Sequence, residues 1–415
     1  MQLTERHIII QSEPLEQLCF KAARLYNFIN YHKRQAFFGK QEDFSEYEIS
    51  GLCAEFKQDD YKNLPAQTSQ QIIKQVFKAW KSYFKALKEF RKYPAKFLGR
   101  PKPPHYKKKD GLGTVFFTAQ QIKLKDGIVK FPKASNIPDL QTKVDNLCQV
   151  RIIPQATCFV IEIIYEKKEE THENIKKENV LMIDLGLNNI VTAIDNVGNR
   201  PFIINGRILK SVNQYFNRRR AKLMSYVGNK GTSKRIEKLT HKRNNKVSDS
   251  LHKISNFILK YCLQHGIGTV VIGKNDHWKQ GGFSTPIKAD IKRQNNQNFI
   301  SVPHAKLIDQ ITYKLALHGI ILIVHEESHT SKCDHFALET IEHHDKYLGR
   351  RVGRGRFKSS TGKLLNADVN GAIGIGRKSK VVQDDFILNL LNTGIAQMPY
   401  RVEYPVKSFN TKCHV

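Results

Sequence analysis

The chain has 415 residues and a formal net charge of +30, with 68 Lys and Arg against 38 Asp and Glu. Its apolar content of 40% supports ordinary hydrophobic cores and excludes a disordered protein. An excess of positive charge this large opposes compaction unless a polyanion neutralises it, and nucleic acid is the commonest such partner. The length leaves room for about two or three domains.

No segment predicts secretion, a membrane span or a disulfide scaffold. The first residues lack the apolar core of a signal peptide, and no stretch approaches about 18 consecutive apolar residues. The seven cysteines include no Cys-x-x-Cys pair, so no standard zinc site is evident. We therefore expect a soluble protein that stays inside the cell and has no membrane partner.

The first part of the chain predicts strands interrupted by two helices. A strand is expected over residues 3–10, and amphipathic helices over 15–38 and 69–92, because apolar residues recur there at helical spacing. Residues 113–167 change to short apolar runs separated by turns, which predicts a small β-barrel or sandwich. The opening strand can join it, in which case the helices are an insertion. A charged linker over 167–178 follows.

The end of the second helix and the proline-rich segment after it are strongly basic. Residues 81–109 hold eleven Lys or Arg and one acidic residue, Glu89. Lysines contact phosphates and aromatic rings stack on bases, so a nucleic-acid surface is one interpretation. The other places the aromatic side chains in a core, which we favour for those within the helix. The candidate contacts are Trp80, Lys81, Lys85, Lys88, Arg91, Lys92, Lys107, Lys108 and Lys109.

An apolar run from Val180 ends at Asp184 and turns through Gly186. This pattern predicts a buried strand that carries a carboxylate at its end. Two short strands follow after tight turns, over 190–194 and 201–204, as in an antiparallel meander. Actin-like ATPases and sugar kinases open in a similar way, and a buried Asp can simply cap a loop. The role of Asp184 therefore depends on which other residues of the chain lie beside it.

Residues 207–247 form a second basic segment, with thirteen Lys or Arg and one acidic residue. The pattern predicts two basic helices broken near residues 228–231. A solvated helix face is the usual role of a charge run, but this run is nearly single-signed, which favours contact with a phosphate backbone. The residues expected to make that contact are Arg218, Arg219, Arg220, Lys242 and Arg243.

The rest of the chain alternates between helices and strands. A helix over 248–265 precedes a strand over 269–272, and a helix over 304–318 precedes a strand over 320–324. The element order, three strands and then alternating helices and strands, is that of a ribonuclease H-like fold. A final helix rich in small residues begins near residue 366.

Carboxylates stand at three of these element ends: Asp184, the pair Glu326 and Glu327, and Asp368. In a basic protein this arrangement suggests phosphodiester chemistry, in which two Mg²⁺ ions about 3.5–4 Å apart activate a water and stabilise the leaving oxygen. Strand alternation lets only one residue of the glutamate pair face the ions, and the sequence leaves open which one.

The motifs together resemble the transposon-encoded TnpB/OrfB family, which is related to the single-effector type V CRISPR nucleases. The resemblance covers nearly the whole chain. It implies an RNA-guided DNA endonuclease that holds a guide RNA from its own transposon end and cleaves double-stranded DNA beside a short target-adjacent motif. The motifs are Met182-Ile183-Asp184-Leu185-Gly186, Ile272-Gly273-Lys274-Asn275 with Trp278-Lys279, Glu326-Glu327-Ser328-His329-Thr330-Ser331 and Asn366-Ala367-Asp368-Val369-Asn370.

The resemblance implies an α+β multidomain fold in a protein of the prokaryotic cytoplasm or nucleoid. A β-barrel wedge domain would comprise residues 1–11 and 105–170, with a helical recognition domain inserted at 12–104. A ribonuclease H-like (RuvC) α/β nuclease domain would span 180–415. It would include the basic helical insert 207–247 and a degenerate zinc-ribbon or target-loading segment at 330–365.

The resemblance also assigns the site. Asp184, Glu327 or Glu326, and Asp368 would be catalytic and would bind two Mg²⁺ ions, with Mn²⁺ as a substitute. Most family members carry the second carboxylate where this chain has Gly273, so a glutamate relocated to the next strand would replace it. Further nucleic-acid contacts would be Lys274, Asn275, Trp278, Lys279, Arg354 and Arg356.

The zinc ribbon of many relatives is reduced here to Cys333, with His335, His343 and His344 nearby. Their spacing fits no standard site, so we expect no zinc. Other functions stay open: a nuclease-dead, RNA-guided DNA-binding repressor, a DNA transposase, and an ATPase or sugar kinase of related fold. The sequence does not distinguish a monomer from a homodimer.

Overall fold

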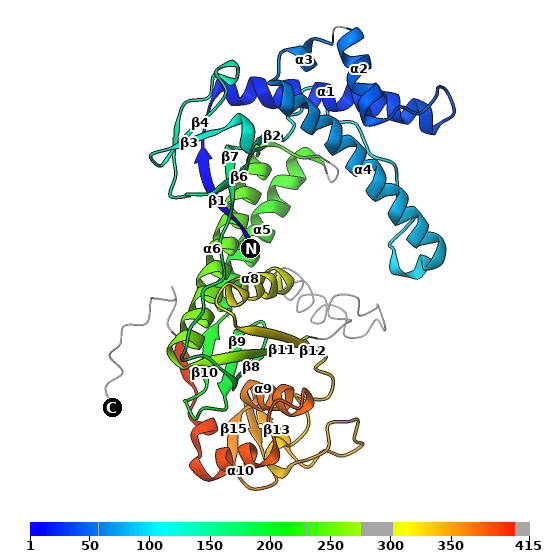
Figure 1. Cartoon of the computed structure of the whole chain (residues 1–415). Coiled ribbons are helices and arrows are strands. Elements are labelled where there is room, and N and C mark those ends of the chain that lie inside the picture. Colours follow the sequence, from blue (N-terminus) through cyan, green and yellow to red (C-terminus); the bar gives the residue numbers. More distant parts are fainter. Residues whose placement is uncertain (57, 229–230, 275–301, 403–415) are drawn as a thin grey trace. The chain divides into compact units, whose positions relative to one another are not determined.

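The computed structural model describes residues 1–56, 58–228, 231–274 and 302–402 (Figure 1). The chain divides into two compact units, residues 1–167 and 168–415. The predicted contacts Asn275, Trp278 and Lys279 lie outside the described residues. Within the described part of the chain, no helix has the length and apolar character needed to cross a bilayer.

The first unit contains two β-sheets. A four-stranded antiparallel sheet has the order β1-β7-β6-β2, and a three-stranded sheet has the order β3-β4-β5. Strand β1 pairs with β7 along its whole length, and the helices of this unit lie between β1 and β2 in the chain. The strands are β1 (Gln2–Ile9), β2 (Val115–Thr118), β3 (Lys123–Lys125), β4 (Ile128–Lys130), β5 (Leu140–Gln141), β6 (Leu147–Pro154) and β7 (Phe159–Glu166).

Two long helices of the first unit, α1 and α4, are those that apolar periodicity predicted. The helices are α1 (Glu13–Phe37), α2 (Glu46–Glu55), α3 (Asp59–Lys62) and α4 (Ala66–Lys92), with 3₁₀ turns η1 (Pro94–Lys96), η2 (Ala119–Gln121) and η3 (Lys133–Ser135). The sequence analysis missed α2, although Ser45 and Glu48 form a reciprocal capping box at its start. Apolar periodicity is weak over the ten residues of α2, so the capping box was the feature of the sequence that indicated this helix.

The second unit is built on a six-stranded sheet with the order β12-β11-β8-β9-β10-β16. Strands β8, β9 and β10 form the expected antiparallel meander, and β11 and β12 run parallel to β8. Strand β8 is therefore central (Figure 1). The strands are β8 (Lys176–Asp184), β9 (Asn189–Asp195), β10 (Phe202–Asn205), β11 (Ile267–Gly273), β12 (Ile321–His325) and β16 (Tyr400–Val402).

The helices of the second unit follow the predicted order with one difference. They are α5 (Arg207–Val227), α6 (Lys234–Gln264), α8 (His304–Ala316), α9 (Ala367–Lys378) and α10 (Asp384–Thr393), with 3₁₀ turns η5 (His335–Ala337) and η6 (Ile395–Gln397). The helix predicted over 248–265 does not start anew, because it is the second half of α6. Ser248 to Ser250 are possible caps, but no Gly or Pro interrupts the chain there, so the basic helix continues.

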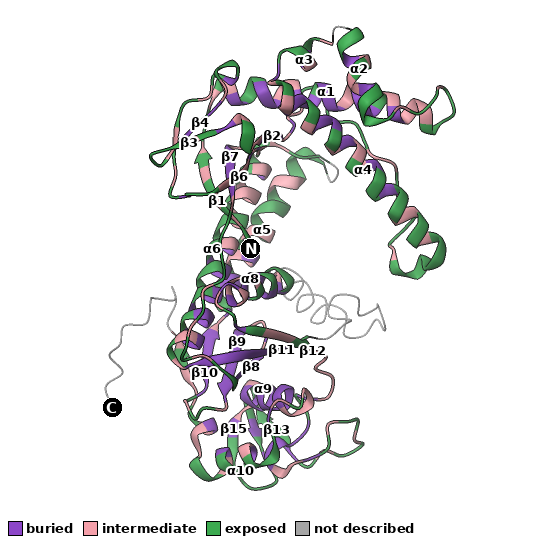
Figure 2. Ribbon diagram, in the orientation of Figure 1, coloured by how far each residue is buried: buried purple, intermediate pink, exposed green. Residues whose placement is uncertain are grey.

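The two faces of β8 pack against different helices. Leu181 and Ile183 join a core with residues of α6 and α8, whereas Val180 and Met182 join a second core with residues of α9. Figure 2 shows that the second half of β8, nearly all of β9 and most of α9 are buried. Because side chains alternate along a strand, Asp184 lies on the α9 face.

A small antiparallel sheet precedes α9. It consists of β13 (Arg350–Gly353), β14 (Arg356–Lys358) and β15 (Leu364–Asn366), in that order. Strand β15 ends at Asn366, whose side chain caps α9 by accepting hydrogen bonds from the amides of Asp368 and Val369. The position of Asp368 in the first helical turn is thus fixed by its neighbour in sequence.

Candidate functional site at the end of the central strand

Asp184 ends β8 beside the first turns of α9. Its carboxylate lies so close to Gly371 of α9 that a Cβ atom on this glycine would be 2.9 Å from Oδ2 of Asp184. Burial and then the negative charges of Asp368 and Glu327 raise the pKa of Asp184 well above its usual range, while Arg351 opposes the shift. The charges of two other carboxylates therefore act on Asp184 at this end of the sheet.

Asp368 approaches Asp184 from the start of α9. Its Oδ2 accepts a hydrogen bond of 2.6 Å from Nδ2 of Asn189, the first residue of β9. The amino end of a helix favours a negative charge, and the bond from Asn189 fixes the direction of this carboxylate. Asn189 thus ties the helix to the sheet next to Asp184.

Glu327 enters the site from the loop after β12. Its Oε2 lies 2.5 Å from the position that a Cβ atom on Gly273 would occupy. Burial and then the neighbouring charge of Glu326 raise the pKa of Glu327 from 4.5 to about 7. The carboxylate of Glu327 and the side chain of Ile375 from α9 thus fill the space beside β11 that Gly273 leaves open.

Glu326 is held elsewhere. It accepts hydrogen bonds from Nζ of Lys378 at 2.6 Å, from Oγ of Ser328 at 2.7 Å and from the amide of Ser328 at 2.8 Å. Partial burial opposes ionisation, but these hydrogen bonds outweigh it and lower the pKa of Glu326 to about 2. Lys378 also donates to the carbonyl oxygen of Ser328 at 2.9 Å, so α9 fixes the loop that carries both glutamates.

The sequence left the choice between Glu326 and Glu327 open, and the geometry separates them. Glu327 faces Gly273 and influences Asp184, whereas Glu326 forms an ion pair with Lys378. Sequence reasoning missed four residues that shape this site: Asn189, Arg351, Gly371 and Lys378. Of these four, Gly371 alone could have been noticed in the sequence. It lies in a predicted helix rich in small residues, where a glycine indicates a position at which a larger side chain would not fit.

Cys333, His335, His343 and His344 do not converge in the described structure. Nε2 of His335 donates to the carbonyl oxygen of Thr330 at 2.7 Å, and its Nδ1 lies 3.1 Å from Nη1 of Arg377. Burial lowers the pKa of His335 to about 4, which agrees with a neutral ring. Nε2 of His344 lies 2.9 Å from the carbonyl oxygen of Thr340.

Two buried carboxylates organise this segment instead. Oδ2 of Asp334 accepts hydrogen bonds from the hydroxyl groups of Ser359 and Ser360 and from the amide of Ser360, at 2.7–3.0 Å. Glu339 accepts from the amides of Asp334 and Leu348 at 2.6 and 2.8 Å. These bonds connect the parts of the segment that a zinc ion would hold in a ribbon.

Another group of potential metal ligands lies away from the carboxylates. Among the described residues, Glu170, His172 and His318 are the group whose ligand atoms all lie within 4.8 Å of one another. Nε2 of His172 is 2.8 Å from Nδ1 of His318. Asp184, Glu327 and Asp368 do not form such a tight group.

The predicted nucleic-acid contacts are mostly exposed. Trp80 is an exception, since it is 2% exposed and its Nε1 donates to Oδ1 of Asn30 at 2.9 Å. Its assignment as a contact residue is therefore corrected: it belongs to the core of the first unit. Arg243 is half-buried. The exposed residues are Lys81, Lys85, Lys88, Arg91, Lys92, Lys107, Lys108, Lys109, Arg218, Arg219, Arg220, Lys242, Lys274, Arg354 and Arg356.

Two family models match the chain. Residues 162–279 match OrfB_IS605, described as "Probable transposase", and residues 304–375 match the Cas12f1-like TNB domain. The chain is thus similar to a transposase family over residues 162–279 and to Cas12f1-like proteins over residues 304–375. The resemblance to the TnpB/OrfB family is confirmed.

A solved structure agrees at the level of the fold. A chain of the cryo-EM structure of the Cas12f1–sgRNA–target DNA complex is 16% identical, with a TM-score of 0.50, covering 88% of this chain and 82% of that one. The mini-RNA-guided endonuclease CRISPR-Cas_phi3 is 11% identical, with a TM-score of 0.45 and 92% of each chain covered. None of the curated proteins matches.

Proposed function

We propose that the chain is an RNA-guided, Mg²⁺-dependent DNA endonuclease encoded by a transposon, which cleaves DNA next to a short target-adjacent motif. The observation that carries this proposal is the convergence of Asp184, Asp368 and Glu327 where Gly273 and Gly371 have no side chain. A buried ion pair or a loop cap would not require three acidic groups to face one another.

The architecture supports a ribonuclease H-like (RuvC) nuclease domain over residues 180–415. Three antiparallel strands followed by two strands parallel to the first place Asp184 at the end of the central strand. We assign residues 1–11 and 105–170 to a wedge domain and 12–104 to a helical recognition insert. Segments 207–247 and 330–365 would be the basic insert and the target-loading segment of the nuclease domain.

The residues at the site fit Mg²⁺. Carboxylate oxygens are the ligands that this hard cation prefers, and Asp184, Asp368 and Glu327 could hold two ions. The raised pKa of Asp184 is what uncompensated negative charge produces. Bound Mg²⁺ would supply activation of the attacking water and stabilisation of the leaving oxygen.

The residues of the chain prepare this site. Asp184, on the central strand, would hold the ions together with Asp368, whose carboxylate is fixed by the hydrogen bond from Asn189. Lys378 neutralises Glu326, which limits the negative charge next to Glu327. Gly371 leaves room for the carboxylate of Asp184 in its position beside α9.

Guide RNA and target DNA would be the partners. The exposed lysines and arginines of residues 81–109 and 207–247 can bind phosphate backbones. A polyanion would neutralise the net charge of +30. The similar Cas12f1 structure was determined with an sgRNA and a target DNA. We place the protein in the prokaryotic cytoplasm or nucleoid.

A repressor that binds guided DNA without cutting it is the second candidate. Gly273 favours it, since most TnpB/OrfB proteins carry a carboxylate at this position. The position of Glu327 weighs against it, because its carboxylate occupies the place that a side chain of Gly273 would enter. A transposase would use the same residues, and only the reaction product would reveal it.

The test is guided cleavage. The protein would be purified with RNA co-expressed from its own downstream locus and incubated with Mg²⁺ and a plasmid whose target has randomised flanks. The proposal expects cleavage by the unmutated protein and none by Asp184→Ala. Tight guided binding without cleavage would establish the repressor instead, and joined strands would indicate a transposase.

A further inference from the structure

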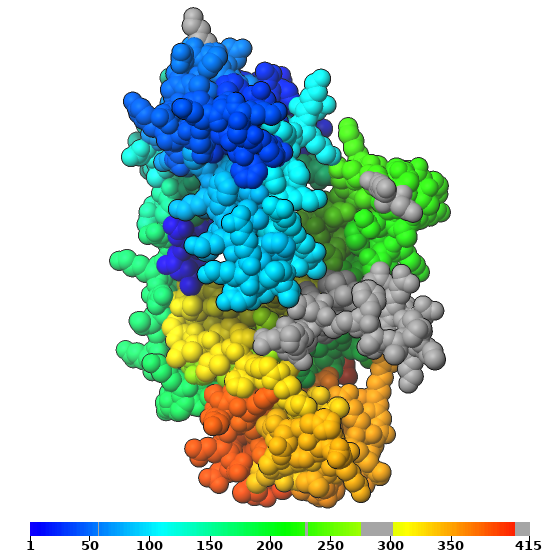
Figure 3. Space-filling model, turned by 90° about the vertical axis from the view of Figure 1, so that its right-hand side faces the viewer, coloured from blue at the N-terminus to red at the C-terminus, as the bar shows by residue number. Residues whose placement is uncertain are grey.

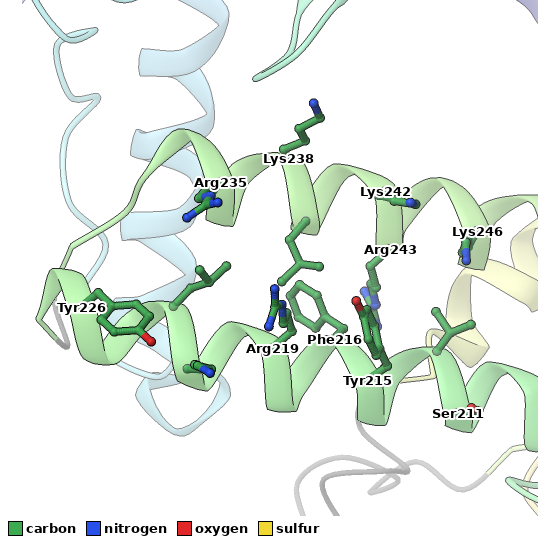
Figure 4. A pocket seen from close by; sticks show the side chains of 14 residues that line it. Ser211, Tyr215, Phe216, Arg219, Tyr226, Arg235, Lys238, Lys242, Arg243 and Lys246 are labelled. Carbon is green, nitrogen blue, oxygen red and sulfur yellow. The ribbon is translucent and has the colours of Figure 1, made fainter.

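Helices α5 and α6 lie side by side and enclose a groove of about 850 Å³ (Figure 4). Fourteen described residues line the groove, of which seven are Lys or Arg and none is Asp or Glu. This single-signed lining is complementary to a polyanion. The hairpin of α5 and α6 reaches the visible surface of the second unit, where it is green in Figure 3.

Two rows of side chains face each other across the groove. Tyr215, Arg219, Lys222 and Tyr226 follow helical spacing along α5, so they share one face, and Tyr215 and Tyr226 are about 16 Å apart along the helix. The second row, on α6, is entirely cationic. It consists of Arg235, Lys238, Lys242 and Lys246.

The floor of the groove is apolar. Val212, Leu223 and Leu239 contribute to it, and the guanidinium of Arg243 lies over the ring of Phe216 at 5.6 Å from its centroid. Nε of Arg243 donates to Oδ1 of Asn213 at 2.7 Å, which holds the stacked arrangement. A solvated basic face would need neither an apolar floor nor this stacking.

The two tyrosines are strongly exposed. Tyr215 is 61% and Tyr226 is 71% exposed, and Figure 4 shows them toward opposite ends of the groove. Aromatic rings stack on the faces of unpaired bases, which a duplex keeps covered by its own stacking. Cations alone would serve a duplex equally well, whereas stacking of exposed rings on bases adds affinity for a single strand, whose bases are uncovered.

We propose that this groove binds an unpaired, single-stranded segment of nucleic acid. Tyr215 and Tyr226 would stack on bases, and the two cationic rows would contact the phosphates. This inference rests on the proposed function in one respect, namely that the ligand is a nucleic acid. It adds that this part of the basic segment binds a single strand rather than a duplex.

The experiment measures binding by the full chain in a buffer that contains a chelator, so that cleavage plays no part. The probes are a labelled single-stranded RNA, a single-stranded DNA of the same sequence and a hairpin duplex. Tyr215→Ala/Tyr226→Ala should weaken binding of a single strand about tenfold or more and change duplex binding less than about twofold. The matched variant Tyr215→Phe/Tyr226→Phe keeps both rings and should retain binding.

A second measurement locates the ligand, because other basic surfaces also bind. A strand containing 5-iodouracil should form photo-crosslinks with peptides of α5 or α6, and the alanine variant should lose them. RNA and DNA strands are tested separately, and a crosslink from either supports the proposal. The proposal would be overturned if the alanine variant weakened single-strand and duplex binding equally, or if crosslinks formed only outside the hairpin. Displacement of the strand by polyglutamate at equal charge would also overturn it.

The result is independent of the nuclease. Crosslinks in the groove of a protein that never cleaves guided DNA would refute the proposed endonuclease and keep the single-strand site. Guided cleavage, together with Tyr215→Ala/Tyr226→Ala weakening only duplex binding, would support the proposed endonuclease and refute the single-strand site.

Discussion

Glu327 and Gly273 compete for one position in space. A Cβ atom on Gly273 would lie 2.5 Å from Oε2 of Glu327, although the two residues belong to the ends of different strands. Strands β11 and β12 are parallel neighbours, with Gly273 opposite His325. A carboxylate from the loop after β12 therefore reaches the place where a side chain of β11 would begin, and the side chain of Ile375 from α9 fills the same place.

Gly371→Ala should reduce cleavage strongly without destabilising the protein. The added Cβ would lie 2.9 Å from Oδ2 of Asp184, so the carboxylate has to move. Alanine is favoured over glycine in a helix by about 1 kcal/mol, so the melting temperature should stay or rise. We expect cleavage to fall at least about tenfold, since displacements of about 1 Å already cost that much or more.

Gly51→Ala is the matched control, because Gly51 is also helical and a Cβ there would meet no atom within 4 Å. It should leave the cleavage rate unchanged. If both variants cleave at the rate of the unmutated protein, Asp184 does not need its observed position.

Lys378→Met should move the acidic limb of the pH–rate profile to higher pH. The methionine keeps most of the apolar stem but removes the charge that neutralises Glu326 and lowers the pKa of Glu327. Glu327 would then hold its proton to higher pH, and cleavage at neutral pH would fall. Lys378→Arg should restore part of the original profile. An unchanged midpoint in Lys378→Met would show that Lys378 does not act through Glu327.

The metal-free protein should lose stability as the pH rises from about 4.5 to about 7. In this window the folded protein keeps a proton on Glu327, whose pKa is raised from 4.5 to about 7, while the unfolded chain loses it. The loss for this group should be about 1–3 kcal/mol in the free energy of unfolding. Glu327→Gln cannot ionise and should lack this part of the pH dependence.

Denaturant titrations at pH 4.5 and pH 8 in the presence of a chelator measure this difference. Equal pH dependence of the unmutated protein and Glu327→Gln would contradict the raised pKa. Added Mg²⁺ should recover stability at pH 8 in the unmutated protein more than in the variant, because only the former gains a charged ligand.

Chelation of zinc should not unfold the segment of residues 330–365. Asp334 and Glu339 connect its parts by hydrogen bonds, so Asp334→Ala should destabilise the segment by about 2 kcal/mol or more through unpaired buried donors. Hydrogen exchange of peptides from this segment measures both effects. Faster exchange after treatment with a zinc chelator, together with unchanged exchange in Asp334→Ala, would show that zinc and not Asp334 holds the segment together.

Much of the sheet could be predicted because its strands are continuous apolar runs that end at turns. The position of Asp184 at the end of β8 could be predicted because it ends such a run. The helix start predicted near residue 248 was wrong because cap residues indicate a possible start but cannot stop a helix already under way. Trp80 was ambiguous because an aromatic residue among lysines suits a core and a contact surface equally.

The choice of Glu327 could not be made from the sequence. It depends on Lys378, which lies 52 residues from Glu326 along the chain and binds it at 2.6 Å. The role of Asn189 likewise depends on Asp368, 179 residues away in sequence. Such partners meet only once the helix and the sheet have packed, so no local pattern reveals them.

The most direct measurement compares guided plasmid cleavage by the unmutated protein, Glu327→Gln and Glu326→Gln, each loaded with the same co-expressed RNA in Mg²⁺. The account predicts that Glu327→Gln binds guided target normally and does not cleave, while Glu326→Gln keeps measurable cleavage. Full activity of Glu327→Gln together with loss of activity in Glu326→Gln would contradict it.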